Sequence, residues 1–472
     1  MRIRPSPAFL TAAVASLVAV IVLVLALGGS SQPPLPLPGI GRPARAGDPF
    51  AYVPSREADF VARAVAGTDH IVYALSPGGV IATAARVARW RALIERATAG
   101  SGIDPNLLEG IVYLESAGRQ NVIAGVDPAA AAGLTQILAR TGQTLLGMHI
   151  DLRRSRALTA KVDRAYAAGR PGLMARLQAR RAQIDDRFDP LKALRGTVRY
   201  LRLAEHRFGR IDLAVESYHM GMGNLQTALD LYDGGQPVPY AQLFFDISPA
   251  NHAPAYGLLR SLSDDSRLYW WRVLASVRIM RMYRTDRPLL ERIAKLQDAT
   301  YSNARVLHPP DRTDVFADPG ALRAAFAARA VLPLPSNPDQ LGLSYEPSMG
   351  RLARRLGQPA RLYRGLRPPA LDLLVELGAR VRALSGASAP LDVVGTVTDK
   401  RYAAAIGGAP VLSSAGWTFQ IARTYASRAQ AEAFQATLDR LQALDLIAWT
   451  RTLDTIDVTV ASDAAKVIVN GP

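Results

Sequence analysis

The spacing of apolar residues changes once along this chain, and that change limits its fold more than any other sequence feature. From Ser55 to about Leu296, apolar residues recur every three or four positions, as in helices with one buried face. After residue 390, three short segments alternate apolar and polar side chains as strands do, around a helical stretch from Arg428 to Leu444. We therefore expect a mainly α fold class, in which an all-α domain is followed by a smaller α+β domain.

Proline-rich segments predict where these domains begin and end. The 472 residues are enough for two or three domains of about 150 residues each. Residues 33–43 and 309–349 are rich in proline, which is typical of linkers. The predicted order is a membrane anchor or signal at residues 1–31, a linker at 32–50, the all-α domain with a helical extension at 51–308, a second linker at 309–349 and the α+β domain at 350–472.

The N-terminal segment decides the expected compartment. The run from Ala8 to Leu27 is mostly apolar and uncharged, and at about 1.5 Å per residue it can cross a ~30 Å hydrocarbon core. A secretory signal is shorter and ends at a small-x-small site, for which only Ala26-Leu27-Gly28 is available. We favour an uncleaved anchor, and a cleaved signal is the alternative. Because Arg2 and Arg4 precede the span, we expect a single-pass membrane protein whose bulk is extracytoplasmic, facing the wall.

Composition excludes several function classes. The chain has no cysteine, which rules out disulfides, thiolate catalysis and Cys-bound zinc. Its six histidines lack the spacing of a zinc-binding helix, so we expect no metal and no cofactor. A net charge of +16 favours anionic partners such as cell-wall polymers, or is the solvated surface of an Arg-rich chain. Because no basic stripe is interleaved with aromatic residues, we expect no nucleic acid partner.

One acidic residue occupies a position where the helical pattern calls for an apolar side chain. Asp104 and Pro105 are typical of a helix start. The apolar stripe of the helix that follows consists of Leu108, Ile111 and Val112. Glu115 is the next position of that stripe, where partial burial raises a carboxyl pKa and keeps the group protonated, as a general acid requires. From this helix alone, Glu115 could equally cap a backbone group or pair with an arginine.

Three short motifs follow one another along the helical part. They are Glu115-Ser116-Ala117-Gly118, Gly133-Leu134-Thr135-Gln136-Ile137 and Ala214-Val215-Glu216-Ser217-Tyr218-His219-Met220-Gly221-Met222-Gly223-Asn224. The surrounding residues, 85–235, resemble the soluble lytic transglycosylase domain, a lysozyme-like family with the motifs Glu-Ser-x-Gly, Gly-Leu-Met-Gln-Ile and Ala-Tyr-Asn-Ala-Gly-x-Gly-Asn. This sequence departs from those motifs at Thr135, which replaces Met, at His219, which replaces Asn, and at Met220, which replaces Ala.

The resemblance implies a role for each matching residue. Glu115 matches the catalytic acid/base, Ser116 the hydroxyl beside it, and Gln136 a glutamine that lines the cleft. Tyr218 matches the tyrosine near the catalytic carboxylate. Glycines that allow a close backbone approach to sugar or to the next helix are matched by Gly133, Gly221 and Gly223. The predicted substrate-binding residues are Ser116, Gly133, Gln136, Tyr218, His219, Gly221 and Asn224.

The same resemblance implies the reaction. Glu115 would protonate the glycosidic oxygen of the β-1,4 bond between N-acetylmuramic acid and N-acetylglucosamine, then take the proton of the muramic C6 hydroxyl as that oxygen attacks C1. The product is a 1,6-anhydro sugar, and the second carboxylate of ordinary glycosidases is unnecessary. The resemblance implies peptidoglycan glycan strands as the partner, and the N-terminal helix adds the membrane. The sequence names no partner among the proteins of the cell envelope. A non-catalytic peptidoglycan-binding scaffold is the alternative.

The tail from about Pro368 resembles the LAS-type fold of D-alanyl-D-alanine carboxypeptidases. In that family, a His-x-x-Gly-x-x-x-Asp block and a later His hold zinc. Here Ser413 and Gln420 stand at the ends of the block, and the later strand carries Asp457. The resemblance therefore implies a domain that has lost its zinc ligands, and an unrelated α+β accessory domain is the alternative.

Overall fold

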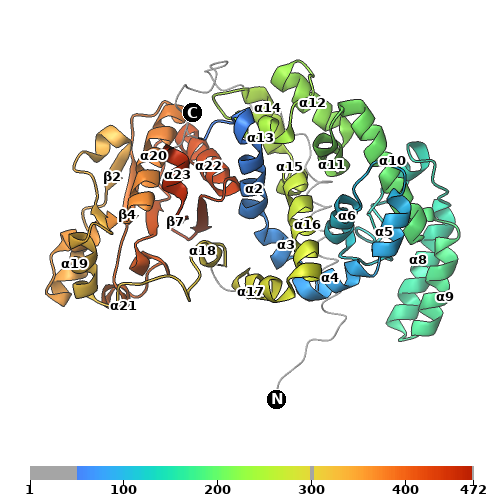
Figure 1. The fold of residues 1–472 in the computed structure, drawn as a ribbon, viewed down its shortest axis with the longest axis horizontal. Helices are drawn as coiled ribbons and strands as arrows, with labels where there is room; N and C mark the ends of the chain where they lie inside the picture. Colours follow the sequence, from blue (N-terminus) through green and yellow to red (C-terminus); the bar gives the residue numbers. More distant parts are fainter. Residues whose placement is uncertain (1–49, 298–301, 470–472) are drawn as a thin grey trace. The chain divides into compact units, whose positions relative to one another are not determined.

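The chain forms two compact units, each assembled from separate stretches of sequence (Figure 1). A computed structural model describes residues 50–297 and 302–469. Unit 1 contains Leu75–Thr227 and Leu262–Leu290. Unit 2 contains residues 50–74, Ala228–Ser261 and the described part of residues 291–469. The two units thus alternate along the sequence, whereas the predicted domains follow one another.

Unit 1 is built from helices, as the three- and four-residue spacing predicts. Its helices are α4 (Val80–Ala88), α5 (Arg91–Thr98), α6 (Pro105–Ser116), α7 (Ala139–Thr144), α8 (Leu152–Ala167), α9 (Pro171–Ala182), η2 (Asp186–Phe188), α10 (Pro190–Phe208), α11 (Ile211–Met220), α15 (Asp264–Arg267) and α16 (Tyr269–Thr285). Two more helices, α12 (Met222–Asp233) and α17 (Arg287–Gln297), continue from unit 1 into unit 2.

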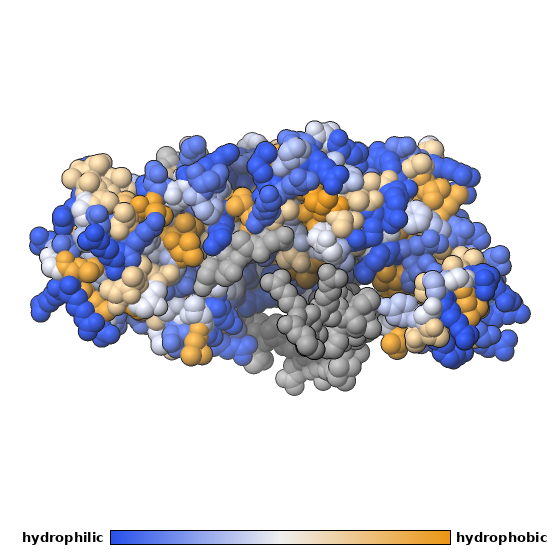
Figure 2. All heavy atoms as spheres, turned by 90° about the horizontal axis from the view of Figure 1, so that it is seen from below, coloured by the Kyte–Doolittle hydropathy of each residue, from blue (hydrophilic) through white to orange (hydrophobic). Residues whose placement is uncertain are grey.

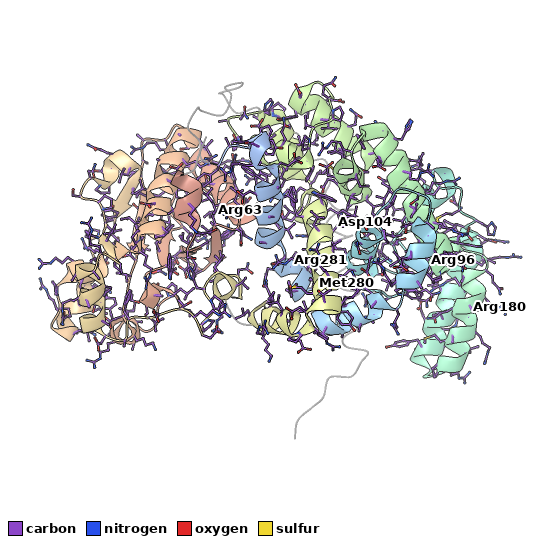
Figure 3. The ribbon with its side chains drawn as sticks, viewed as in Figure 1. Arg63, Arg96, Asp104, Arg180, Met280 and Arg281 are labelled. Carbon is purple, nitrogen blue, oxygen red and sulfur yellow. The ribbon has the colours of Figure 1, made fainter. Side chains whose placement is uncertain are left out.

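Helix α6 lies at the centre of unit 1 and begins where the sequence predicts. Asp104 lies at the start of this helix (Figure 3). Its carboxylate accepts a hydrogen bond from the Asn106 backbone N–H at 2.8 Å, with Pro105 at the first helical position. The predicted stripe, Leu108, Ile111 and Val112, is fully buried. Helix α6 ends at Ser116 because Ala117 turns left-handed, with a φ of 52°.

Helices α6 and α16 pack side by side (Figure 1). Gly110 allows the α16 backbone to lie close against α6, because a Cβ there would lie 2.9 Å from the Val273 carbonyl oxygen. This close packing brings the N-terminal turn of α16 next to the C-terminal turn of α6.

Unit 2 combines helices with a mixed sheet. Its N-terminal and central helices are η1 (Pro54–Arg56), α2 (Glu57–Thr68), α3 (His70–Ala74), α13 (Tyr240–Asp246), α14 (Ala253–Ser261) and α18 (Ser302–Leu307). Its later helices are α19 (Pro319–Ala327), η3 (Pro338–Leu341), η4 (Arg351–Leu356), η5 (Ala360–Tyr363), α20 (Pro368–Ser385), α21 (Lys400–Ala405), η6 (Ser413–Ala415), α22 (Arg428–Ala443) and α23 (Ala464–Val469).

The main sheet of unit 2 has the strand order β2-β4-β5-β7-β6. Its strands are β2 (Leu343–Tyr345), β4 (Leu391–Gly395), β5 (Thr418–Ala422), β6 (Ile447–Arg451) and β7 (Thr455–Val460). Only β2 and β4 pair in parallel, and the other neighbours are antiparallel. Helices α20 and α22 contact each other and the sheet. A two-stranded ribbon joins β1 (Leu332–Pro333) to β3 (Gly365–Leu366).

These elements confirm the predicted succession of an all-α part and an α+β part, including strands at β4, β5 and β7 and the helix α22. Residues 309–349, predicted to be a linker, contain α19, β1, η3 and β2, and β2 is an edge strand of the main sheet. Their proline and glycine residues therefore shape turns within unit 2 rather than only separating domains.

Exposed apolar residues are scattered over the surface. On the face shown in Figure 2, hydrophobic side chains form small groups among hydrophilic ones. Across residues 50–297 and 302–469, none of the helices has both the length and the apolar character needed to cross a bilayer. The expected anchor, from Ala8 to Leu27, lies outside the described residues.

Candidate active site

Glu115 lies in the last turn of α6, partly buried beside the N-terminal turn of α16. Tyr269, the first residue of α16, donates a hydrogen bond from its hydroxyl to Oε1 of Glu115 at 2.6 Å. The Tyr269 side chain is itself buried, at 3% exposure, so the bond is held by packing. Among the described residues, no other hydrogen-bond donor reaches the Glu115 carboxyl group.

The surroundings of Glu115 favour its protonated form. Burial raises the pKa of Glu115 to about 7, the Tyr269 hydrogen bond opposes that rise, and the negative charge of Asp265 adds to it. A carboxyl group with a pKa near 7 is both a proton donor and, after donation, a proton acceptor at neutral pH. Asp265 pairs with Arg272, which partly neutralises it.

Two aromatic rings stack on Tyr269, and a third ring packs against one of them. The Tyr218 ring lies nearly parallel to the Tyr269 ring, with centroids 6.2 Å apart, and the His219 ring is stacked on it at 5.3 Å. Tyr200 packs edge-on against Tyr218 at 5.1 Å. Burial raises the pKa of both Tyr218 and Tyr269, so their hydroxyls remain hydrogen-bond donors throughout the physiological range.

Tyr218 connects the third motif to the second. Its hydroxyl donates to the Thr135 carbonyl oxygen at 2.7 Å and lies 3.2 Å from the Thr197 hydroxyl. The structure thus brings together Glu115 and Tyr218, through Tyr269, and links both to the segment that carries Gln136. His219 is exposed, and its Nδ1 lies 3.1 Å from the Ser266 hydroxyl.

The segment that carries Gln136 is a tight turn that packs against the backbone of Arg187. Gln136 has a φ of 51°, and its side-chain amide donates to the Gly133 carbonyl oxygen at 2.8 Å. A Cβ on Gly133 would overlap the Arg187 carbonyl oxygen, so this glycine does permit a close backbone approach. The approach is to the protein's own chain, and the Gln136 amide is bound to its own turn.

Arg187 supports the same turn with its side chain. Its guanidinium, fully buried, donates to the carbonyl oxygens of Pro128 at 2.6 Å and Ala130 at 2.9 Å. Asp185, also fully buried, pairs with it at 2.7 Å. Because other N–H groups of the Arg187 guanidinium donate to carbonyl oxygens, these hydrogen bonds offset the cost of removing the ion pair from water.

The other predicted substrate-binding residues make local contacts. The Ser116 hydroxyl is buried and donates to the Val112 carbonyl oxygen at 3.2 Å, within its own helix. Asn224 donates to the Met220 carbonyl oxygen at 2.9 Å. Gly221 has a φ of 86°, which favours glycine for conformational reasons, and a Cβ on Gly221 or Gly223 would meet nothing within 4 Å.

Two further glutamates in unit 1 have structural partners. Glu109 is fully buried and pairs with Arg284 at 2.6 Å and with Arg91 at 3.2 Å. Glu216, in the third motif, is also fully buried and accepts a hydrogen bond from the Trp270 backbone N–H at 2.8 Å. Glu216 therefore satisfies an amide in the first turn of α16, next to Tyr269.

The three motifs assign no role to Asp265 or Tyr269, because both residues lie outside them. The available signal was the segment Asp265-Ser266-Arg267-Leu268-Tyr269 just before a long helix. Nothing in that segment indicates contact with Glu115, since 154 residues separate the two partners of the hydrogen bond.

In unit 2, two of the three positions expected to have lost zinc ligands, Gln420 and Asp457, form a polar pair within the sheet. The Gln420 amide on β5 donates to the Asp457 carboxylate on β7 at 2.8 Å, and Ser413 is buried in η6. Within the part of the chain that the structure describes, no three His, Asp or Glu side chains converge as metal ligands do. The resemblance of this region to metallopeptidases stays a prediction.

Comparison with known proteins identifies one domain. Residues 92–236 match the family model described as the transglycosylase SLT domain. This range includes Glu115, Gln136 and Tyr218, and it supports a transglycosylase-type enzyme of the lytic transglycosylase family, acting on peptidoglycan. Tyr269 and Asp265 lie beyond the matched range. No curated protein and no solved structure matches the chain.

Proposed function

We propose that this protein is a lytic transglycosylase that cleaves the β-1,4 bond between N-acetylmuramic acid and N-acetylglucosamine and leaves 1,6-anhydro ends. Glu115 is the single acid/base. The observation that carries this proposal is a carboxyl group inside the matched domain that is partly buried and accepts a hydrogen bond from Tyr269, an environment that raises its pKa to about 7.

In the first step, the protonated Glu115 gives its proton to the glycosidic oxygen as the C1–O bond breaks. Tyr269 occupies Oε1, so the transferred proton is carried by Oε2. The Tyr269 hydroxyl then stabilises the carboxylate that forms, because a hydrogen bond to an ionised acceptor is stronger than one to a neutral acceptor.

In the second step, the Glu115 carboxylate takes the proton of the muramic C6 hydroxyl while that oxygen forms a bond to C1. The proton balance closes on Glu115, and no water enters the product. Ordinary glycosidases need a second carboxylate about 5 to 9.5 Å away as a nucleophile or to activate water. The described carboxylates near Glu115 are committed elsewhere, Asp265 to Arg272 and Glu216 to the Trp270 amide, which supports a one-carboxylate reaction.

The test is digestion of purified peptidoglycan by the protein and by Glu115→Gln, with products separated and weighed by mass spectrometry. We expect anhydromuropeptides from the wild type and a loss of at least about 10³-fold in Glu115→Gln, as for the removal of an essential acid/base. Glu95→Gln is the matched control, because Glu95 is exposed and pairs only with Arg91 among described residues. Products with reducing, hydrated muramic ends would show a hydrolase instead.

A peptidoglycan-binding scaffold without activity is the competing function. It predicts that the protein sediments with insoluble peptidoglycan and releases no product at any pH from about 4 to 8, a range that includes the pKa of Glu115, about 7. Release of anhydromuropeptides at any pH in that range excludes it.

We also propose that the chain is a single-pass membrane protein with units 1 and 2 outside the cytoplasm. The support is the uncharged apolar run from Ala8 to Leu27 after Arg2 and Arg4. The test is protease accessibility in intact cells stripped of their wall. Digestion of units 1 and 2 is expected, and full protection in sealed cells would contradict the orientation.

A further inference from the structure

The helices α8 and α9 form a hairpin in which half of the protein's net charge is concentrated. Residues 152–182 contain nine basic residues and one acidic residue, Asp163, so the hairpin carries +8 of the chain's +16. It makes up only 31 of 472 residues. An Arg-rich composition spread evenly over the chain does not produce such a concentration.

The hairpin has an apolar seam of its own. Val162 and Ala165 on α8 pack against Leu177 on α9, with Leu158, Leu173 and Met174 alongside. Only one basic residue, Arg181, takes part in the interior, where its guanidinium lies 3.6 Å from the centre of the Phe188 ring. The other eight basic side chains are exposed.

Most of these exposed cations are not neutralised within the protein. Arg156 pairs with Asp127 at 2.9 Å and Arg154 with Asp151 at 3.5 Å. The other six form no ion pair with any described residue, and they are Arg153, Lys161, Arg164, Arg170, Arg176 and Arg180. Figure 3 shows Arg180 at the edge of α9. Like charges gathered on one hairpin repel one another and oppose folding, and an anionic ligand bound there would offset this repulsion.

We propose that this hairpin is a docking surface for a linear phosphodiester polyanion of the cell wall. This binding goes beyond the proposed function. The charge and geometry of the hairpin indicate a phosphodiester polymer, and only the choice of the cell wall as its source rests on the proposed function. Seven of the eight exposed cations are arginines, whose planar guanidinium binds a phosphate through two parallel hydrogen bonds. Arg176 and Arg180 are four residues apart, about 6 Å along α9, and can contact successive phosphates of one chain.

The residues on the hairpin disfavour two other polyanionic partners. Nucleic acid bases stack on several aromatic side chains, and the only aromatic residue of the hairpin is Tyr166. Insertion into a bilayer requires an exposed apolar face, and Tyr166, 50% exposed, is the only large hydrophobic residue exposed on α8 and α9.

The docking surface is connected to the segments that border the candidate active site. Both oxygens of Asp127 accept hydrogen bonds from Arg156 of α8, at 2.9 Å each. Asp127 precedes the turn that carries Gln136, and Asp185, just after α9, pairs with the Arg187 that supports this turn. A polymer held by the hairpin is thus retained on the same unit as Glu115.

The experiment compares two variants with equal loss of charge. The hairpin variant carries Arg153→Gln, Arg164→Gln, Arg176→Gln and Arg180→Gln. The control variant carries Arg351→Gln, Arg354→Gln, Arg355→Gln and Arg361→Gln, four exposed arginines of unit 2 that form no ion pair with described residues. Binding of labelled poly(glycerol phosphate) is measured over a range of NaCl concentrations, in Glu115→Gln backgrounds, so that the outcome does not depend on catalysis.

We expect the hairpin variant to lose at least tenfold in affinity and about 3 in the slope of log K against log salt, at ~0.7 per lost phosphate contact. The control variant should stay within about twofold of the parent. An Arg→Lys version of the hairpin variant should keep most of the salt slope and lose part of the affinity, because lysine keeps the charge but not the two-pronged contact.

Three results would overturn the proposal. One is an equal loss in the hairpin and control variants, which would mean that net charge alone drives binding. Another is tighter binding to single-stranded nucleic acid or to phosphatidylglycerol vesicles at equal phosphate concentration. The last is unchanged binding to insoluble cell wall after hydrofluoric acid has removed its phosphodiester polymers. If the Arg→Gln variant does not fold, the Arg→Lys version and Arg176→Gln with Arg180→Gln provide the same comparison.

Discussion

Two opposing influences act on the pKa of Glu115, and their balance decides whether this carboxyl group can both donate and accept a proton. Burial and the nearby Asp265 charge favour the protonated carboxyl group, whereas the Tyr269 hydroxyl favours the carboxylate. A carboxyl group influenced by burial alone would donate its proton poorly, and one influenced by the hydrogen bond alone would be ionised before substrate arrives. The pKa of about 7 results from both.

Removing the Tyr269 hydroxyl should shift the pH dependence of activity upward. In Tyr269→Phe the carboxylate loses its donor, so the pKa of Glu115 rises above about 7. A hydrogen bond to a charged group is worth about 1.5 kcal/mol or more, so the alkaline limb of kcat/KM should move up by roughly one pH unit, with a lower maximum. Tyr218→Phe is the control, because the Tyr218 hydroxyl bonds to Thr135 and not to Glu115. An unchanged limb in Tyr269→Phe would show that Glu115 does not set it.

Glu115 should also make the folded protein less stable at high pH. Its pKa is raised from 4.5 to about 7, so between these values the folded chain keeps a proton that the unfolded chain has lost, and stability falls as the pH rises. Glu115→Gln mimics the neutral form, and it should be more stable than the wild type by up to roughly 3 kcal/mol at pH 8 and about equal at pH 4. Urea unfolding at both pH values measures this. Equal stability at pH 8 would mean that Glu115 is not desolvated.

At the scale of elements, the turn before α7 depends on backbone contact rather than on side-chain packing. Gly133 lies directly against the Arg187 carbonyl oxygen, and the Arg187 side chain binds carbonyl oxygens of the same segment. Residues 128–137 are therefore held in place by Arg187 of η2. The same segment carries the Thr135 carbonyl oxygen, which accepts the hydrogen bond from Tyr218.

Gly133→Ala should destabilise the protein, because an added Cβ would overlap the Arg187 carbonyl oxygen and the φ of 83° is strained for alanine. We expect a loss of about 2–4 kcal/mol in the free energy of unfolding and a weaker contact between Thr135 and Tyr218. Gly223→Ala is the matched control, since Gly223 lies in α12 with open space around it and should change stability by less than about 1 kcal/mol. The melting temperatures of both variants show whether a glycine of the motifs is needed for close backbone packing, as we expect for Gly133, or has no steric role, as we expect for Gly223.

At the scale of the whole molecule, unit 2 is completed by residues far apart in the sequence. Arg63 of α2 pairs with Asp463 at 3.0 Å, and Gly67 of the same helix lies against the Gln442 carbonyl oxygen at the end of α22. His308 is stacked on Trp417 at 4.5 Å. Helix α2 is therefore covered by the C-terminal part of the chain.

A chain that ends at residue 308 should consequently lose stability in residues 50–74. Without α22, helix α2 is uncovered, and we expect the melting temperature to fall by about 10 °C or more, at ~2–4 °C per kcal/mol, with proteolysis within α2. Adding residues 309–472 as a separate fragment should restore protection. Unchanged melting of the truncated chain would mean that the predicted domain boundary at residue 308 also separates folding units.

Much of the fold could be predicted from the sequence because local patterns decide it. The Asp104 cap, the buried stripe of α6 and the strands β4, β5 and β7 all follow from residues next to one another. Strand β2 was missed because three residues carry too little alternation, and β6 was missed because its first three residues, Ile447, Ala448 and Trp449, are all apolar and do not alternate. The position of β2 beside β4 depends on pairing across 48 residues, as the contact between Ser344 and Asp392 shows.

The sequence by itself determined where a carboxyl group would be partly buried on a helix, and which three motifs would accompany it. It did so because helix periodicity and turn preferences are local properties of the chain. Only the tertiary structure decided that Tyr269 donates to Glu115, that Asp265 lies near it, and that residues 50–74 complete unit 2. Such pairings are set by how closely distant helices pack, as α6 and α16 do at Gly110, and no local pattern encodes that distance.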